Sequence, residues 1–142
     1  MRLVLDTATM VAAIRSDAGA SRRLLRGALD RRFTLLASVA LLIEYESVLT
    51  RQDHRSASGL SVDDVQKLLD TVASVIEPVS LDYAWRPQLA DPDDDMVLDA
   101  AINGRADAIV TFNIRDFREG AARFGIRIVS PGNAVRMMKE SQ

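Results

Sequence analysis

The chain has 142 residues with 48% hydrophobic and 27% charged side chains, which suits one compact domain and excludes disordered and fibrous classes. Its formal net charge of −2 at pH 7 argues against binding nucleic acid over the whole surface, although a local basic strip is compatible with it. Because it has no cysteine and no apolar run of about 18 residues, disulfides, thiolate chemistry and a membrane span are excluded, and we expect a cytoplasmic protein.

Short apolar stretches rich in β-branched residues predict the strands of the fold. They lie at residues 4–5, 33–37, 108–110 and 127–129. Apolar residues at helical spacing predict helices over residues 21–30, 38–50, 61–76 and 93–103, and a last helix that begins at Ser130-Pro131. Ser61 and Asp64 have the spacing of a capping box, and Gly104 follows the helix over 93–103 as a stop signal. Residues 51–59 and 82–92 are predicted loops.

Strands that alternate with helices indicate a mostly parallel sheet covered by helices on both faces. The sequence therefore predicts an α/β fold of the three-layer α/β/α sandwich type. No internal repeat or low-complexity tract divides the chain, so we expect residues 1–142 to form a single domain.

Several acidic or amide side chains are placed to meet at one edge of this sheet. Asp6 ends the first strand, Asn113 and Asp116 follow the strand over 108–110, and residues 93–95 are three consecutive aspartates at the start of a helix. Ligands of open α/β sheets bind at the carboxyl ends of the strands. Carboxylates brought together repel one another, so such a cluster needs a cation. With oxygen ligands, no cysteine and one histidine, His54, in a polar stretch, the expected ion is Mg²⁺ or Mn²⁺.

Structural roles compete with this interpretation for every one of these acids. Asp6 also suits a helix N-cap, and residues 93–95 suit a first helical turn because of the helix dipole. Asp99 follows the last of them by four residues, so it either shares a helix face with it or points to solvent. Glu44 and Glu46 both flank the apolar stripe of their helix, and periodicity does not choose between them.

At this point the residues resemble a known family. Residues 4–7 (VLDT), 41–45 (LLIEY), 91–98 (DPDDDMVL) and 106–117 (ADAIVTFNIRDF) resemble, in order and spacing, the acidic motifs of PIN domains, in the variant with Asn113 in place of an aspartate. The similarity runs from residue 2 to about 135. Within the family, the chain is most similar to the VapC-type toxin ribonucleases.

The resemblance implies a metal-dependent ribonuclease that hydrolyses phosphodiester bonds of RNA and leaves a 5′-phosphate and a 3′-hydroxyl. The residues that would carry the site by motif are Asp6, Glu44, Asp94, Asn113 and Asp116. Asp6, Glu44 and Asp94 would be acidic metal ligands, with Asn113 or Asp116 completing the set. Asp95 competes with Asp94 as a ligand, and Thr111 would order the site by hydrogen bonding.

One position departs from the family pattern. Two residues after Asp6 the family usually has Asn, and this chain has Ala8, whose methyl group cannot hydrogen-bond a carboxylate or a metal-bound water. Thr7 or Thr9 can compensate. The alternative is a catalytically degenerate PIN domain that acts as an RNA-binding or protein-interaction module. An aspartyl-phosphate enzyme is disfavoured because neither lysine lies beside a strand end.

RNA binding requires cations that contact its phosphates. The candidates are Arg22, Arg23, Arg26, Arg51, Arg55 and Arg115, of which Arg115 lies within the last motif; a solvated helix face is the competing interpretation for each. The resemblance also implies a homodimer and a small antitoxin protein that inserts into the active-site groove. The apolar faces within residues 41–49 and 61–76 can serve either contact or the core.

Overall fold

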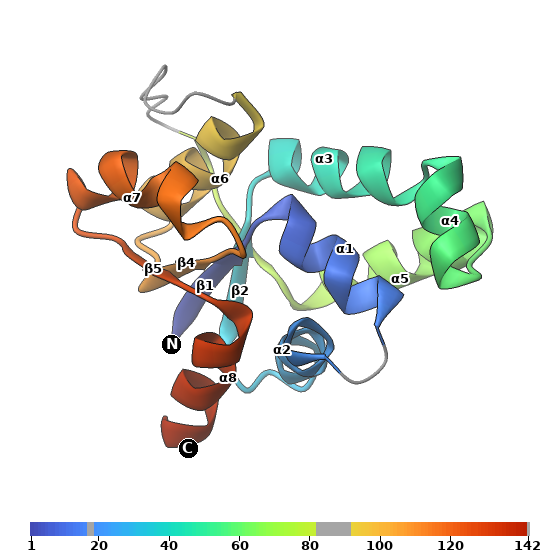
Figure 1. Ribbon diagram of the computed structural model, residues 1–142, viewed down its shortest axis with the longest axis horizontal. Coiled ribbons are helices and arrows are strands. Elements are labelled where there is room, and N and C mark those ends of the chain that lie inside the picture. Colours follow the sequence, from blue (N-terminus) through green and yellow to red (C-terminus); the bar gives the residue numbers. More distant parts are fainter. Residues whose placement is uncertain (17–18, 82–91, 142) are drawn as a thin grey trace.

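The fold is a five-stranded, entirely parallel sheet in a computed structural model that describes residues 1–16, 19–81 and 92–141 (Figure 1). The strand order is β3-β2-β1-β4-β5. The strands are β1 (Arg2–Leu5), β2 (Thr34–Ala37), β3 (Glu77–Pro78), β4 (Ala108–Val110) and β5 (Arg127–Val129). In register, Leu3 pairs with Leu35 of β2 and with Ala108 of β4, which makes β1 the central strand.

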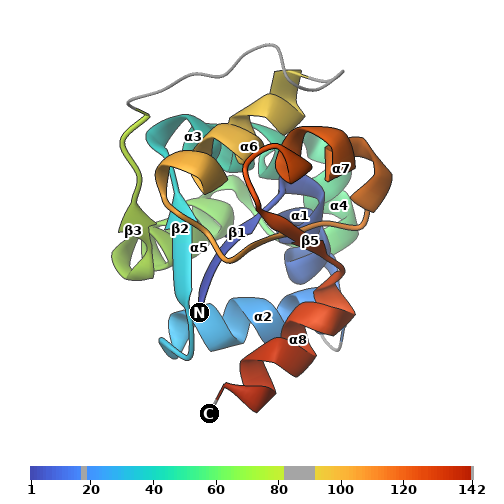
Figure 2. The same cartoon turned by 90° about the vertical axis from the view of Figure 1, so that its left-hand side faces the viewer.

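The helices of the described residues cover both faces of this sheet. They are α1 (Thr7–Arg15), α2 (Ala20–Leu29), α3 (Val39–Leu49), α4 (Gln52–Ser58), α5 (Val62–Val75), α6 (Pro92–Asn103), α7 (Ile114–Ala122) and α8 (Pro131–Glu140). Helix α6 packs on β1, β2 and β4, and α7 packs on β5. Figures 1 and 2 show α1 and α5 on the opposite side of the sheet from α6 and α7, so the predicted three-layer α/β/α sandwich is confirmed.

The chain order of the strands places a ligand-binding edge next to β1. From β1 the chain builds β2 and β3 on one side and then crosses back to build β4 and β5 on the other. The carboxyl ends of β1 and β4 therefore flank the point at which the strand order reverses, which is where open α/β sheets bind ligands. Both strands are fully buried from Leu3 to Leu5 and from Ala108 to Val110, so this edge stands on a rigid core.

Most predicted elements are confirmed with shifts of one or two residues at their ends. Ser38, Ser61 and Ser130 cap α3, α5 and α8 through their side chains, and Asp64 completes the capping box of α5. None of the described helices is both long and apolar enough to cross a bilayer.

The predicted loop over 51–59 is wrong, because residues 52–58 form helix α4. This segment is short and mostly polar, so it carries no apolar periodicity; Gly59, with φ of 75°, ends it in the left-handed conformation that glycine adopts without strain. The predicted loop over 82–92 lies outside the described residues except for Pro92, which begins α6. The side chain of His54 also lies outside the described part. Strand β3 and helices α1 and α7 were not predicted.

Candidate active site

Asp6, the first residue after β1, is held in one orientation by neutral hydrogen-bond donors. Its side chain is 4% exposed and caps α1. One carboxylate oxygen, Oδ1, accepts the backbone N–H of Thr9 at 2.8 Å, and Oδ2 accepts the hydroxyl of Thr111 at 2.5 Å. Both donors are neutral groups, so neither bond supplies a positive charge to the carboxylate. The N-cap role weighed from the sequence is therefore real, but it uses only one of the two oxygens.

Further hydrogen bonds tie the ends of β1 and β4 together around this carboxylate. The backbone N–H of Asp6 donates to the carbonyl of Val110 at 3.1 Å, and the Thr9 hydroxyl donates to the same carbonyl at 3.2 Å. The hydroxyl of Thr111 also accepts the backbone N–H of Asn113 at 2.9 Å. Thr111 thus connects Asp6 with the segment that leads into α7.

Tyr45 positions helix α3, and with it Glu44, against the end of β1. The Tyr45 side chain is fully buried, and its hydroxyl donates to the carbonyl of Leu5. Burial, together with the negative charge of Asp6, raises the pKa of Tyr45 well above its usual range, so the phenol stays protonated and remains a donor. Glu44 is half-buried on the side of α3 that faces Asp6, whereas Glu46 is exposed on another side. Packing therefore distinguishes the two glutamates that periodicity left equivalent.

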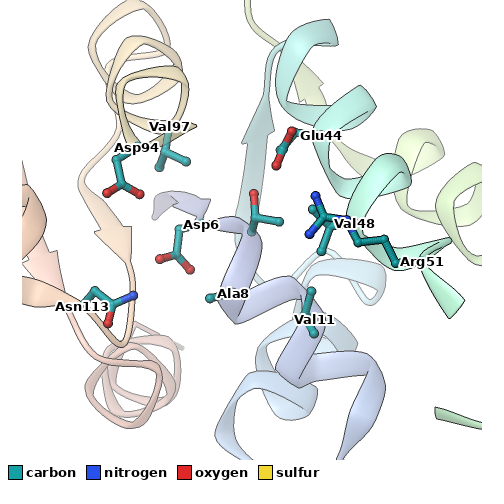
Figure 3. A pocket seen from close by; sticks show the side chains of 10 residues that line it. Asp6, Ala8, Val11, Glu44, Val48, Arg51, Asp94, Val97 and Asn113 are labelled. Carbon is teal, nitrogen blue, oxygen red and sulfur yellow. The ribbon is translucent and has the colours of Figure 1, made fainter. Parts of the chain in front are cut away.

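A pocket of about 350 Å³ lies at this edge of the sheet (Figure 3). We call it the acidic pocket, and its lining residues are Asp6, Thr7, Ala8, Val11, Glu44, Val48, Arg51, Asp94, Val97 and Asn113. Three of them are carboxylates, and they come from the β1–α1 junction, from α3 and from α6. In the view of Figure 3, Asp6 lies between Asp94 and Asn113 on one side and Glu44 on the other. Segments far apart in sequence thus bring polar side chains to one cavity.

The structure separates the other acidic candidates by their place around this pocket. Asp94 is half-buried and lines it, whereas Asp95 is 4% exposed and is not among its lining residues. Asp99 is only 2% exposed, so the possibility that it points to solvent is wrong. Asn113 lines the pocket, and Asp116 is exposed in the first turn of α7 outside it. Asp91 and the side chain of Asp93 lie outside the described residues.

The oxygen atoms that line the acidic pocket suit a hydrated hard cation. Across residues 1–16, 19–81 and 92–141, no three acidic or histidine side chains lie close enough together to enclose an ion. Mg²⁺ normally keeps several of its waters and binds through one or two carboxylates. The oxygen-only set of Asp6, Glu44 and Asp94 around a cavity with room for water therefore fits Mg²⁺ or Mn²⁺ in its chemistry.

Ala8 is exposed and lines the acidic pocket, so the position that departs from the family pattern does face the site. Of the two threonines that can compensate for it, Thr9 already uses its hydroxyl on the carbonyl of Val110. Thr7 lines the pocket and is the hydroxyl group available there.

The arginine candidates divide into structural and exposed side chains. Arg22 donates to the carbonyls of Ala13 and Ile14, at 2.9 Å for Ile14, and so closes the end of α1. Arg55 donates to the carbonyl of Thr50 at 3.1 Å and closes α3 in the same way. Exposed arginines are Arg23 and Arg26 on α2, Arg115 on α7, and Arg51. Of these, Arg26 lines a separate cavity of about 430 Å³, and Arg51 lines the acidic pocket.

Comparisons with known proteins identify the fold and the family of the chain. A chain of the crystal structure of VapBC2 from Rickettsia felis, bound to a DNA fragment from their promoter, has a similar fold, with a TM-score of 0.64 over 92% of this chain and 98% of that chain at 19% identity. A comparison with curated protein sequences finds no match. The family model of the PIN domain matches residues 2–115. The chain therefore belongs to the PIN-domain family.

Proposed function

We propose that this protein is a metal-dependent endoribonuclease that uses Mg²⁺ or Mn²⁺. The observation that carries the proposal is the convergence of Asp6, Glu44, Asp94 and Asn113, from separate segments, on one pocket at the carboxyl ends of β1 and β4. Membership of the PIN-domain family supports a nuclease. We expect the protein to act on RNA in the cytoplasm.

The side chains have separate roles in this proposal. Asp6 and Asp94 hold the ion, and Asp6 is already oriented for it by Thr9 and Thr111. Glu44 would contact the ion through one of its waters or orient the attacking water. When bound, a divalent ion supplies a water of lowered pKa and neutralises charge on the leaving oxygen. Asn113 adds an uncharged amide on the Asp94 side of the pocket, where it can hydrogen-bond a phosphate oxygen or a water.

The first test is Mg²⁺-dependent cleavage of a labelled RNA by purified protein. Asp6→Asn keeps an oxygen acceptor for the Thr9 N–H but removes the charge, so we expect cleavage to fall by at least about a hundredfold in a folded protein. The matched control is Asp70→Asn, an exposed residue of α5 outside the acidic pocket, which should cleave at the parental rate. Full activity of Asp6→Asn would refute the assignment of the site.

We further propose that the protein is the toxin of a toxin–antitoxin pair, forms a homodimer and binds a small antitoxin. The similarity in fold to a chain of VapBC2 supports this proposal. The apolar faces considered from the sequence are mostly core, since Leu41, Leu49 and Val72 are buried. Val39 and Ile43 of α3 are instead 70% and 61% exposed. The parent should therefore have the mass of a dimer in light scattering, and Ile43→Glu should have the mass of a monomer. A monomeric mass for the parent would contradict the homodimer.

The competing function is a degenerate PIN domain that binds RNA or protein without cleavage. Ala8 favours it, because the pocket wall there carries a methyl group in place of an amide. A calorimetric titration with Mn²⁺ separates the two functions. The catalytic site should bind the ion in the parent and lose it in Asp94→Asn, whereas a degenerate site should bind it in neither.

A further inference from the structure

The acidic pocket has a cation in its wall that the roles proposed above leave unused. Arg51 lines the pocket together with the three carboxylates, and its side chain is exposed. Figure 3 shows its guanidinium extending toward the pocket from the side opposite Asp94 and Asn113. Within the described part of the chain, this guanidinium makes no ion pair or side-chain hydrogen bond. Arg51 therefore places a positive charge beside the acidic pocket without forming an ion pair with one of its carboxylates.

The backbone explains why Arg51 is placed there. Thr50 ends α3, and Arg51 is the N-cap of α4 in an extended conformation, with φ of −61° and ψ of 141°. Its N–H donates to the carbonyl of Val48 at 3.2 Å, which fixes the turn between the two helices. Arg55, four residues later, is instead committed to the carbonyl of Thr50. In the α3–α4 turn, Arg55 thus stabilises the fold, whereas Arg51 lines the acidic pocket.

Electrostatics give this arrangement a use in substrate binding. Three carboxylates around one cavity repel an incoming phosphodiester, and a single divalent ion offsets only part of that charge. A guanidinium on the rim attracts the strand and matches two phosphate oxygens with a planar pair of N–H donors. An arginine that served only to neutralise the acids would be expected to lie in an ion pair with one of them. Arg51 is better suited to contact an external anion.

We propose that Arg51 is a positioning residue that binds a phosphate of the RNA next to the bond to be cut. This inference rests on the proposed nuclease function for the identity of the substrate. Because Arg51 would contact the RNA and not the ion or the attacking water, its removal should weaken substrate binding while the chemical step is retained. Lysine at this position keeps the charge but loses the planar pair of donors.

The decisive measurement is the salt dependence of RNA binding. Affinity of the parent, Arg51→Gln and Arg51→Lys for a short fluorescent single-stranded RNA is measured by anisotropy in EDTA over a series of KCl concentrations, so that nothing is cleaved. Each lost phosphate contact reduces the slope of log affinity against log salt by about 0.7 for single strands. We expect that reduction, with about tenfold weaker binding, for Arg51→Gln. Arg51→Lys should keep the parental slope with intermediate affinity, and Arg136→Gln, an exposed arginine of α8, should behave as the parent.

A second readout separates this inference from the proposed function. In Mg²⁺-dependent cleavage, Arg51→Gln should raise KM about tenfold and leave kcat within about twofold of the parent. Parental slope and KM in Arg51→Gln would overturn the role of Arg51 while leaving the nuclease intact. Failure of the parent to cleave, combined with a reduced slope in Arg51→Gln, would refute the nuclease but retain Arg51 as an RNA contact. A fall in kcat without a change in slope would also overturn the inference, since it indicates disturbance of the site.

Discussion

The two ends of the central strands both carry carboxylates, and the partners of these carboxylates differ. At the amino ends, Asp107 accepts the backbone N–H of Arg2 at 2.7 Å, and Glu77 forms an ion pair with the Arg2 guanidinium. The same guanidinium donates to the carbonyl of Gly104 at 2.8 Å. At the carboxyl ends, the Asp6 carboxylate accepts hydrogen bonds from the neutral Thr9 N–H and Thr111 hydroxyl, and it borders a cavity.

This difference distinguishes a structural use of acids from a binding use. A carboxylate that shares a guanidinium is already compensated, so an added cation gains little there. The hydrogen bonds to the buried Asp6 carboxylate come from a hydroxyl and a backbone amide and bring no compensating ion. This difference supports the proposed role of Asp6 in binding a cation, whereas Glu77 joins β3 to β1.

The largest expected effect concerns Glu44 and Glu46, which share helix α3 but not the acidic pocket. Glu44→Gln removes a carboxylate from the pocket, so kcat/KM for RNA cleavage should fall roughly a hundredfold. Glu46→Gln changes an exposed residue and should leave kcat/KM within about twofold. Equal losses in the two variants would show that the pocket is not the reactive site, and would break the contrast between the two ends of the sheet.

The next effect tests whether neutral donors hold Asp6. Thr111→Val removes a fully buried hydroxyl that serves both Asp6 and the N–H of Asn113, so the free energy of unfolding should fall by about 1–3 kcal/mol. Urea denaturation measures it. Thr71→Val, which removes an exposed hydroxyl bonded to the carbonyl of Lys67, should change it by less than about 0.5 kcal/mol. Similar losses of unfolding free energy in the two variants would mean that the hydrogen bond from Thr111 to Asp6 contributes no more to stability than an exposed one.

Local sequence signals were sufficient for the part of the site that follows the strands. Asp6 and Asn113 could be placed because a buried strand ends close before each of them and the sheet is parallel, whereas Thr111 came only from the family resemblance. Periodicity could not choose Glu44 over Glu46, and only the family resemblance did, because the orientation of α3 depends on the long-range bond from Tyr45 to the Leu5 carbonyl.

Three of the elements that escaped sequence analysis lack a long apolar stripe of their own, whereas α1 buries Met10, Val11 and Ile14 and was missed despite its apolar face. Helix α4 consists mostly of polar residues between Arg51 and Gly59, so the position of Arg51 on the pocket could not be inferred. Helix α7 buries only Phe117, Gly120 and Ala121. Strand β3 has two residues and is recognised by its pairing with β2, which no local pattern encodes.

A substitution at Ala8 is expected to increase the affinity of the acidic pocket for a metal ion. Ala8→Asn adds a neutral amide to the pocket wall at an exposed position, where it meets no steric obstacle from a buried core. If hydrogen bonding limits the site, Mn²⁺ affinity measured by calorimetry should rise by about tenfold. Ala57→Asn, at an exposed position of α4 outside the pocket, is the control and should leave the affinity unchanged. No change in Ala8→Asn would indicate that Thr7 already supplies the missing contact.

The smallest effect belongs to the structural end of the sheet and is visible in its pH dependence. The hydrogen bonds from Arg2 hold the pKa of Glu77 below its usual value. A lowered pKa in the folded state stabilises the protein above the unfolded pKa of about 4.3, and this contribution is lost as the pH falls through the folded value. At pH values above about 5, Glu77→Gln should therefore have a slightly lower Tm than the parent. The difference in Tm between the two proteins should vanish at lower pH.

Adding Mg²⁺ to the same thermal measurement at pH 7 joins the two ends of the sheet in one experiment. An ion that binds only the folded state raises Tm. It should raise the Tm of the parent and of Glu77→Gln equally, because the Arg2–Glu77 pair lies at the amino ends of the strands. Asp6→Asn should show no such rise. A rise in Asp6→Asn as large as in the parent would place the ion elsewhere, and the distinction between compensated and uncompensated carboxylates would no longer identify the binding edge.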